Sequence, residues 1–258
     1  MIQVNIALSG GGSRGVAHVG VLKALHEFGI EPAAMSGTSA GSIVGALICD
    51  GFTTEEIIEI IRKFEFKNRI NFQSFRTGTG FFSMEPVTQL LKKNLRSKNI
   101  EDLRLPLYVT AADFNTGKAH AFSTGNIIER VVASCSIPIV FSPVYIEGIP
   151  YVDGGLSCNL PVDPYLKDTK KIVGVNVNPI VAYHNNLGFW GNLDRTLNLF
   201  VKESGMRHQE KCHLLVEPKG LEKFYLFDSK HMNDMIEIAY TYVVSHLNKE
   251  EILTKLEE

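Results

Sequence analysis

The sequence predicts an α/β fold with a mostly parallel sheet and helices on the faces of that sheet. Two observations carry this prediction. Short apolar runs of strand length alternate with segments whose apolar residues recur at helical spacing, and glycine-rich turns join the two kinds of segment. Such alternation is typical of parallel strands connected through helices. The 258 residues suffice for one large core and contain no clear linker, so a single domain over 1–258 is the simplest interpretation.

The predicted elements alternate along the chain. The strand candidates are the apolar runs 3–10, 32–37, 105–114, 170–178 and 212–218. The helix candidates are 15–29, 41–51, 55–64, 126–136 and the C-terminal stretch 233–257. Gly29 is suited to end the first helix, and Thr53 or Thr54 is suited to cap the third, whose leading glutamates favour the positive helix start.

Two segments interrupt this alternation. Residues 64–82 interleave phenylalanines with basic residues and glycines. The sequence leaves open whether they fold onto the core or form a lid or interfacial patch that faces lipid. Residues 183–196 include the only tryptophan, Trp190, and are a candidate for the mouth of a pocket.

Composition and charge exclude several classes of protein. The formal net charge of -2 provides no basic field of the kind that nucleic-acid binding needs, so we expect no nucleic-acid partner. The four cysteines include no close pair, which argues against a zinc site and a disulfide framework. The N-terminus lacks a signal-peptide pattern and no apolar run approaches about 18 residues. We therefore expect a cytoplasmic protein, and the sequence leaves open a transient, peripheral contact with a membrane surface.

The first glycine-rich motif, SGGGSRG, joins the first strand to the first helix. Gly10, Gly12 and Gly15 satisfy the G-x-G-x-x-G spacing of a dinucleotide-binding loop. The following strand brings no acidic residue for the ribose, since Glu31 precedes that strand, and no Gly-Lys-Ser/Thr follows the loop as a phosphate-binding loop requires. The motif still predicts exposed backbone N–H groups at a positive helix start, which would also suit an oxyanion hole.

The second motif, GTSAG, places Ser39 between Gly37 and Gly41. It lies directly after a predicted strand and directly before a predicted helix. On such a turn, glycines two residues to either side let neighbouring chains approach, and the serine side chain is exposed at the corner. The motif therefore predicts a nucleophile elbow with Ser39 as the nucleophile.

A serine nucleophile needs a base that accepts its proton. None of the eight histidines has a motif context that stands out, and His18, one turn into the first helix, is more typical of a packed or exposed histidine than of a base. The third motif, YVDGGLSCNLPV, places Asp153 before Gly154 and Gly155. Asp-Gly is also a common turn pair, so a surface turn stays open beside a carboxylate base for Ser39.

The ordered motifs GGGSRG, GTSAG and DGG, with ASCSIPIVFSPV before the last, resemble those of the patatin-like phospholipases. The resemblance covers about 4–162 by motif and continues more loosely to about 218. It implies a three-layer α/β/α sandwich, a Ser39–Asp153 catalytic dyad, and no metal or other cofactor. It also implies an oxyanion hole built from the glycine loop and the residue after the nucleophile. These residues are Gly10, Gly11, Gly12, Ser13, Arg14, Gly15 and Ala40.

Two positions in these motifs are compared with the family pattern. Arg14 stands where the family has a basic residue, and the sequence leaves open whether it pairs at the surface or adds positive potential near the oxyanion. The third motif reads DGG where many members have DGA, a change that leaves the base in place. A bulky residue at Gly12 is expected to cut turnover with little change in folding.

The resemblance implies a serine lipid acyl hydrolase that acts on a lipid or acyl-ester substrate through an acyl-enzyme. Two alternatives stay open: a catalytically silent patatin-like protein that binds lipid or regulates, and a dinucleotide-binding oxidoreductase. The sequence does not predict the acyl chain, the positional preference or the oligomeric state.

Overall fold

The computed structural model describes residues 1–63, 82–179, 204–226 and 228–257, with the single positions 192, 195, 196 and 199 between them. The predicted lid segment 64–82 lies outside the described residues except for Phe82. Most of the predicted pocket-mouth segment 183–196 lies outside them as well.

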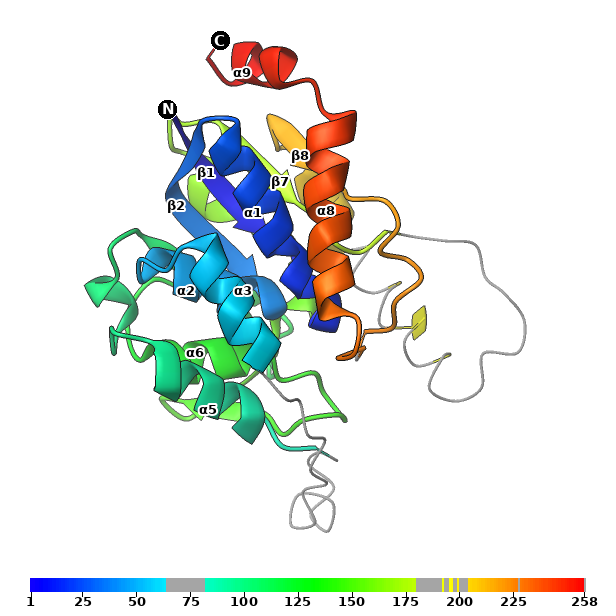
Figure 1. Cartoon of the computed structure of the whole chain (residues 1–258). Helices are drawn as coiled ribbons and strands as arrows, with labels where there is room; N and C mark the ends of the chain where they lie inside the picture. Colours follow the sequence, from blue (N-terminus) through cyan, green and yellow to red (C-terminus); the bar gives the residue numbers. More distant parts are fainter. Residues whose placement is uncertain are drawn as a thin grey trace.

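A central eight-stranded sheet organises the described part of the chain (Figure 1). The strands are β1 Ile2–Leu8, β2 Ile30–Thr38, β3 Leu107–Asp113, β4 Ala119–Phe122, β5 Val144–Ile146, β6 Ile149–Asp153, β7 Ile172–Val175 and β8 Leu214–Val216. Parallel pairing joins β3, β2, β1, β7 and β8 in that order, while β4 and β6 pair antiparallel with β3 and β5 pairs antiparallel with β6. The prediction of a mostly parallel α/β sheet is confirmed.

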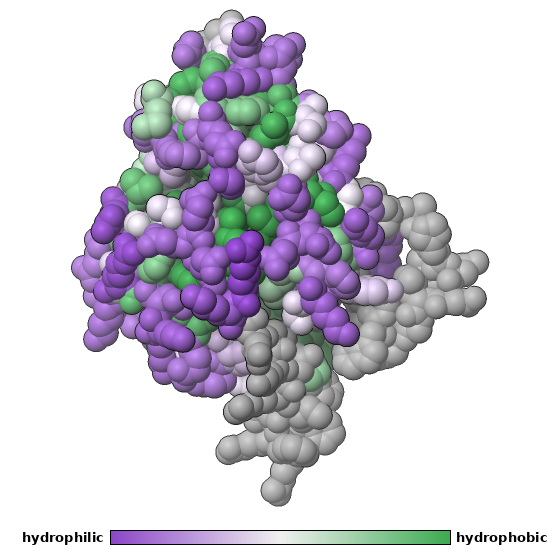
Figure 2. Space-filling model, viewed as in Figure 1, coloured by the Kyte–Doolittle hydropathy of each residue, from purple (hydrophilic) through white to green (hydrophobic). Residues whose placement is uncertain are grey.

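Helices cover one face of this sheet (Figure 1). The helices are α1 Ala17–Glu27, α2 Ala40–Cys49, α3 Thr54–Lys63, α5 Glu85–Asn94, α6 Ile127–Ser134, α8 Met232–His246 and α9 Lys249–Glu257. Their inner sides share one apolar core with alternate residues of β1 such as Ile6 and Leu8. Figure 2 shows that the outer side of these helices is mostly hydrophilic, with apolar residues between them, as expected for amphipathic helices at a surface.

The opposite face of the sheet has a smaller core. There Ala7 and Ala34 pack with Leu160, Val162 and Tyr165 from the segment that follows β6. A short 3₁₀ helix, Asp163–Tyr165, lies in this segment, and the helical residues 204–209 pack against the segment through a contact between His208 and Asp163. Helical segments therefore flank the sheet on both faces, as the predicted three-layer class requires.

Local sequence signals explain several element boundaries. Gly29 follows α1 with a φ of 86°, which permits the left-handed turn that ends the helix. Thr53 caps α3, because its hydroxyl accepts the Glu56 N–H at 3.2 Å while the Glu56 carboxylate accepts the Thr53 N–H at 2.8 Å.

The predicted helix 233–257 is wrong as a single helix. Leu247 is extended, with φ -105° and ψ 126°, and the Asn248 side chain accepts the Glu250 N–H at 3.0 Å to start α9. The capping asparagine thus divides the stretch into α8 and α9. No helix in the described ranges is both long enough and apolar enough to cross a lipid bilayer.

Strand topology brings two distant chain segments together. Thr110 of β3 pairs with β2 on one edge and with β4 on the other, while Ala111 pairs with β4 and with Asp153 of β6. Strands β2 and β6 therefore share one edge of β3 and approach each other end to end. Ser39, which follows β2, and Asp153, the last residue of β6, meet at this junction.

Candidate active site

Ser39 sits on a sharp turn between β2 and α2. Its φ of 50° and ψ of -125° are unusual for a residue with a side chain. The flanking glycines are required by close approach, because a Cβ at Gly37 would lie 2.5 Å from the Gly41 carbonyl carbon and one at Gly41 would lie 2.5 Å from the Ser9 carbonyl oxygen. The structure therefore has the elbow shape that the motif predicts.

A second serine holds this turn in place. The Ser39 N–H donates to the Ser134 hydroxyl at 2.8 Å, and that hydroxyl donates to the Thr110 carbonyl at 2.5 Å. Ser134 is fully buried at the end of α6. The sequence ASCS contains Ser134 but gives no sign of this role, because its partner lies 95 residues away in the chain.

Asp153 lies beside Ser39, and both side chains are buried, with 6% and 7% of their surface exposed. The Ser39 side chain interacts with the Asp153 carboxyl, which also accepts the Gly155 N–H at 2.7 Å. Burial raises the pKa of Asp153 to about 6, against the lowering effect of Ser39 and of the Gly155 N–H. The surface-turn alternative for the DGG motif is thereby excluded, since Asp153 is not at the surface.

The glycine loop passes next to this pair. Some of its N–H groups already donate to carbonyls within the protein, whereas others are available to a ligand. Those of Gly10, Ser13 and Arg14 donate to the carbonyls of Asn159, Leu226 and Gly11 at 3.2, 2.7 and 3.1 Å. Gly15 lies inside the 3₁₀ helix Gly12–Val16. Among the described residues, no hydrogen-bond acceptor is found for the N–H groups of Gly11, Gly12 and Ala40.

The expectation that a bulky residue at Gly12 spares the fold is wrong. Gly12 has a φ of 56°, and a Cβ there would lie 2.3 Å from the backbone carbonyl oxygen of Leu226. Because this neighbour is backbone, the loop itself would have to move. A substitution at Gly12 therefore changes both the loop and its packing.

Two adjoining cavities meet at Ser39. The smaller, of about 40 Å³, is lined by the glycine loop, Asp153 and Asn159. The larger, of about 150 Å³, is lined almost entirely by apolar side chains from α2, α3 and α5, among them Ile43, Ile57 and Val87. Ser39 and Gly12 line both, so a group that reacts at Ser39 can place a polar part in one cavity and an apolar part in the other.

Arg14 and His18 are both buried. Arg14 is buried, with 2% of its surface exposed, so the surface alternative is wrong. His18 is a packed histidine whose Nε2–H donates to the Ser9 carbonyl at 2.8 Å, and burial lowers its pKa to about 4. The neutral His18 imidazole is hydrogen-bonded to the Ser9 carbonyl, directly before the glycine loop. His18 therefore supports this loop rather than Ser39.

Comparison with known proteins agrees with this geometry. The family model described as patatin-like phospholipase matches residues 6–166, which include the glycine loop, the elbow and Asp153. The chain belongs to the patatin-like phospholipase family. The glycine loop lies within the matched family region. Its G-x-G-x-x-G spacing therefore no longer supports the dinucleotide-binding alternative.

Several relatives are similar over much of this chain. An uncharacterized protein of Acanthamoeba polyphaga mimivirus is 29% identical over 70% of this chain and 66% of its own length. An uncharacterized NTE family protein of Mycobacterium tuberculosis is 29% identical, with 71% of this chain and 49% of that protein covered. A lysophospholipase of Candida albicans is 29% identical over 74% of this chain but 15% of its own length. The chain thus spans less than two thirds of each.

A solved structure shares the fold. The crystal structure of VipD from Legionella pneumophila superposes with a TM-score of 0.54 over 99% of this chain and 67% of that one. Sequence identity is 11%, so this likeness concerns the fold alone.

Proposed function

We propose that this chain is a serine lipid acyl hydrolase that cleaves carboxylic esters through Ser39 and Asp153. One observation carries the proposal: Ser39 and the buried Asp153 lie together where an apolar cavity meets a loop in which the Gly11 and Gly12 N–H groups have no acceptor among the described residues. Family membership supports the same reaction class. A serine needs only a positioned base and oxyanion donors to attack an ester.

The first step forms an acyl-enzyme. Asp153 accepts the Ser39 proton while the hydroxyl oxygen attacks the ester carbonyl carbon. A carboxylate with a pKa of about 6 is ionised at neutral pH and is a stronger base than an ordinary aspartate. The alcohol part of the ester then leaves with a proton from the Asp153 carboxylic acid.

The developing oxyanion needs preorganised donors. The N–H groups of Gly11, Gly12 and Ala40 are the candidates that lack other acceptors among the described residues. Ala40 is the first residue of α2, so its N–H also lies at the positive end of a ten-residue helix. Loss of one such donor typically costs about 3 kcal/mol of barrier. In the second step, water activated by Asp153 attacks the acyl-enzyme and releases the acid.

The apolar cavity favours the acyl part of a lipid as the group that is bound. Side chains from α2, α3 and α5 supply most of its walls, and Cys135 and Phe141 also line it. An extended hydrocarbon is the ligand that such a lining binds best. We infer transient contact with a membrane or micelle surface, where such substrates reside.

The test uses a fluorophosphonate, which labels activated serines, followed by intact-mass spectrometry. We expect one adduct on the wild type at Ser39, none on Ser39→Ala, and at least about 100-fold slower labelling of Asp153→Asn. Two exposed positions provide matched controls, Ser123→Ala and Asp234→Asn, which should label like the wild type.

Turnover separates the hydrolase from a silent lipid-binding protein. Mixed micelles of lysophospholipid, diacyl phospholipid or monoacylglycerol are incubated with wild type and Ser39→Ala, and released fatty acid is measured. Release by the wild type alone supports the proposal. Binding of the same micelles by both proteins without release would support the silent alternative.

A further inference from the structure

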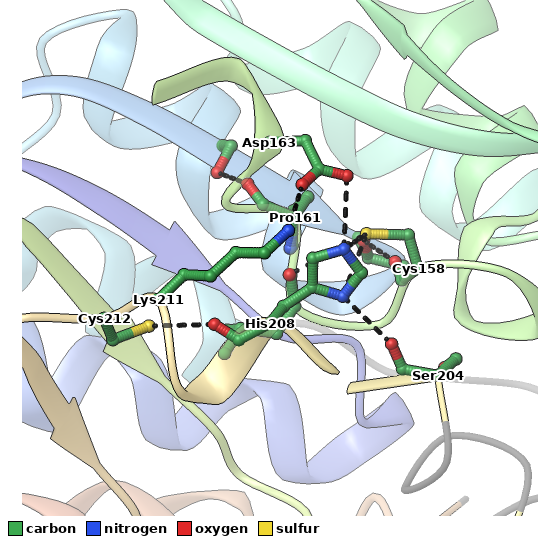
Figure 3. A network of polar contacts seen from close by, with 10 residues as sticks. Cys158, Pro161, Asp163, Ser204, His208, Lys211 and Cys212 are labelled. Atoms are coloured by element: carbon green, nitrogen blue, oxygen red, sulfur yellow. Dashed lines mark hydrogen bonds and ion pairs between the residues drawn. The ribbon is translucent and has the colours of Figure 1, made fainter. Parts of the chain in front are cut away.

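Three side chains converge on the face of the sheet opposite the large helices (Figure 3). His208 Nε2 lies 3.1 Å from Asp163 Oδ2, and Cys158 Sγ lies 3.9 Å from the same nitrogen. One donor atom from each of the three lies within 4.8 Å of those of the other two. Cys158 and His208 are buried, whereas the Asp163 side chain is 55% exposed and opens the cluster to solvent.

The remaining polar atoms of the cluster are already engaged. His208 Nδ1 lies 3.2 Å from the Ser204 carbonyl, which can only accept, so Nδ1–H donates to it. Nε2 faces Asp163 Oδ2 at 3.1 Å, a contact that either a proton on the ring or a metal ion bound by both atoms can bridge. Lys211 Nζ lies 3.1 Å from the other oxygen, Oδ1, and leaves Oδ2 facing His208 (Figure 3).

We propose that Cys158, Asp163 and His208 bind a divalent transition-metal ion of the zinc class. Thiolate, imidazole and carboxylate are the ligands that zinc prefers, and a ligating histidine usually donates its other N–H to a carbonyl, as His208 does to Ser204. On binding, the Cys158 thiol proton leaves to solvent and the sulfur becomes the third protein ligand. Water from the open side of Asp163 completes a tetrahedral shell.

Two of the three donor pairs have separations near those of a zinc site, and the third lies within 4.8 Å. Zinc bond lengths and tetrahedral angles require donor–donor separations of about 3.4 to 3.6 Å. The observed Nε2–Oδ2 and Sγ–Nε2 separations of 3.1 and 3.9 Å lie on either side of that range. The sulfur is almost equidistant from both ring nitrogens, at 4.0 and 3.9 Å, so binding includes a rotation of the thiol toward Nε2.

A metal ion at this site would restrain the segment around Cys158 and Asn159, which contacts the candidate active site. The Cys158 carbonyl accepts the Thr38 hydroxyl at 2.9 Å, directly before the nucleophile. The next carbonyl, of Asn159, accepts the Gly10 N–H at 3.2 Å. A metal ion that joins Cys158 and Asp163 to His208 would therefore brace this segment against the helical residues 204–209 without touching the substrate.

Sequence spacing does not predict such a site. The spacing of the cysteines argues against a zinc site. His208 lies 50 residues from Cys158, however, and the two approach each other only in the folded chain. The inference is independent of the proposed hydrolase activity, because none of the three ligands lines the cavities at Ser39.

Cobalt(II) is the probe, because a cobalt–thiolate bond gives a near-ultraviolet charge-transfer band and tetrahedral cobalt gives visible bands. The full chain is purified with a chelator, freed of it, and titrated with Co²⁺ and then with competing Zn²⁺. We expect both sets of bands at one ion per chain and their loss on addition of one Zn²⁺ per chain. Zn²⁺ should also protect Cys158 from alkylation, as mapped by mass spectrometry.

Variants identify the ligands. Cys158→Ser, His208→Gln and Asp163→Asn should each weaken Co²⁺ binding by more than the 10- to 100-fold that outer-shell changes typically cost. Cys212→Ser is the matched control, since that thiol lies near His208 outside the donor set, and it should keep the bands. Lys211→Gln should bind more tightly, because it removes a positive charge beside the ion. Ser39→Ala should bind like the wild type and separates this result from the activity.

Two outcomes would overturn the proposal. One is a wild-type protein that shows no cobalt–thiolate band and no protection of Cys158 at saturating metal. The other is a band that persists in a folded Cys158→Ser protein, which would identify binding elsewhere. If Cys158→Ser does not fold, the protection measured on the wild type decides alone.

Discussion

The backbone N–H of Ser39 donates to the Ser134 hydroxyl, 2.8 Å away, and thereby links the turn before α2 to the end of α6. Ser39 has backbone angles that a residue with a side chain adopts only when its surroundings hold it there. Ser134 provides such a restraint from within the core. We infer that Ser134 is a positioning residue for the nucleophile.

Removal of this restraint should affect catalysis more than binding. We expect Ser134→Ala to lower kcat by about 10- to 100-fold with a smaller change in KM, because a displaced nucleophile loses reaction geometry. The buried Ser39 N–H also loses its acceptor, which costs about 1–3 kcal/mol of unfolding free energy. Ester hydrolysis and urea unfolding measure the two effects.

Two variants separate positioning from general destabilisation. Ser136→Ala removes a nearby hydroxyl that donates only to the Val132 carbonyl, at 2.8 Å, and should keep near-normal kcat. Ser134→Thr keeps a hydroxyl and should restore part of the activity. Equal fluorophosphonate labelling rates for Ser134→Ala and wild type would contradict the assignment.

Local motifs explain why much of the fold was predictable. The elbow is visible in the spacing of Gly37, Ser39 and Gly41, although the close approach at Gly41 is to Leu8 and Ser9 at the end of the neighbouring strand β1. The parallel strands and most helices are likewise visible as apolar runs with caps at their ends. Asn248 was missed because a capping asparagine inside a helical pattern is a weak signal.

Contacts between distant segments were not predictable in the same way. The approach of Asp153 to Ser39 depends on β2 and β6 sharing an edge of β3, a consequence of topology that no spacing encodes. The availability of each N–H in the glycine loop depends on carbonyls of Asn159 and Leu226, far along the chain. For this reason the predicted oxyanion hole contained more donors than the structure leaves available.

The pH dependence of activity should report Asp153. The carboxylate is the active form of the base, and burial raises its pKa to about 6. We therefore expect kcat/KM to fall about tenfold per pH unit below about pH 6 and to be level just above it. The measurement is a pH profile with a soluble ester. An acid limb near pH 4, typical of an exposed aspartate, would contradict the assignment of Asp153 as base.

The same pKa predicts a cost in stability. A carboxyl whose pKa is raised on folding stabilises the folded state below its unfolded pKa of 3.8, and this contribution is lost as pH rises through about 6. Asp153→Asn cannot ionise, so its unfolding free energy relative to wild type should be higher at pH 8 than at pH 4. The upper limit of that difference is about 3 kcal/mol.

Urea unfolding of both proteins at the two pH values measures this difference. Asp234→Asn, at an exposed position of α8, is the control and should show no comparable pH dependence. A relative stability of Asp153→Asn that is the same at both pH values would mean that burial does not penalise the ionised Asp153.

The apolar cavity predicts which substrates the chain prefers. Ile43 lies one helical turn after Ser39 on α2 and lines this cavity. Ile43→Phe should fill part of the space, so we expect kcat/KM for long-chain esters to fall at least about tenfold relative to short-chain esters, since the lost volume is needed only by the longer chain. Ile43→Leu conserves volume and should keep the wild-type ratio. An equal loss for short and long esters would instead indicate damage at Ser39, because a misplaced nucleophile slows every substrate alike, and the acyl chain would then have to lie elsewhere.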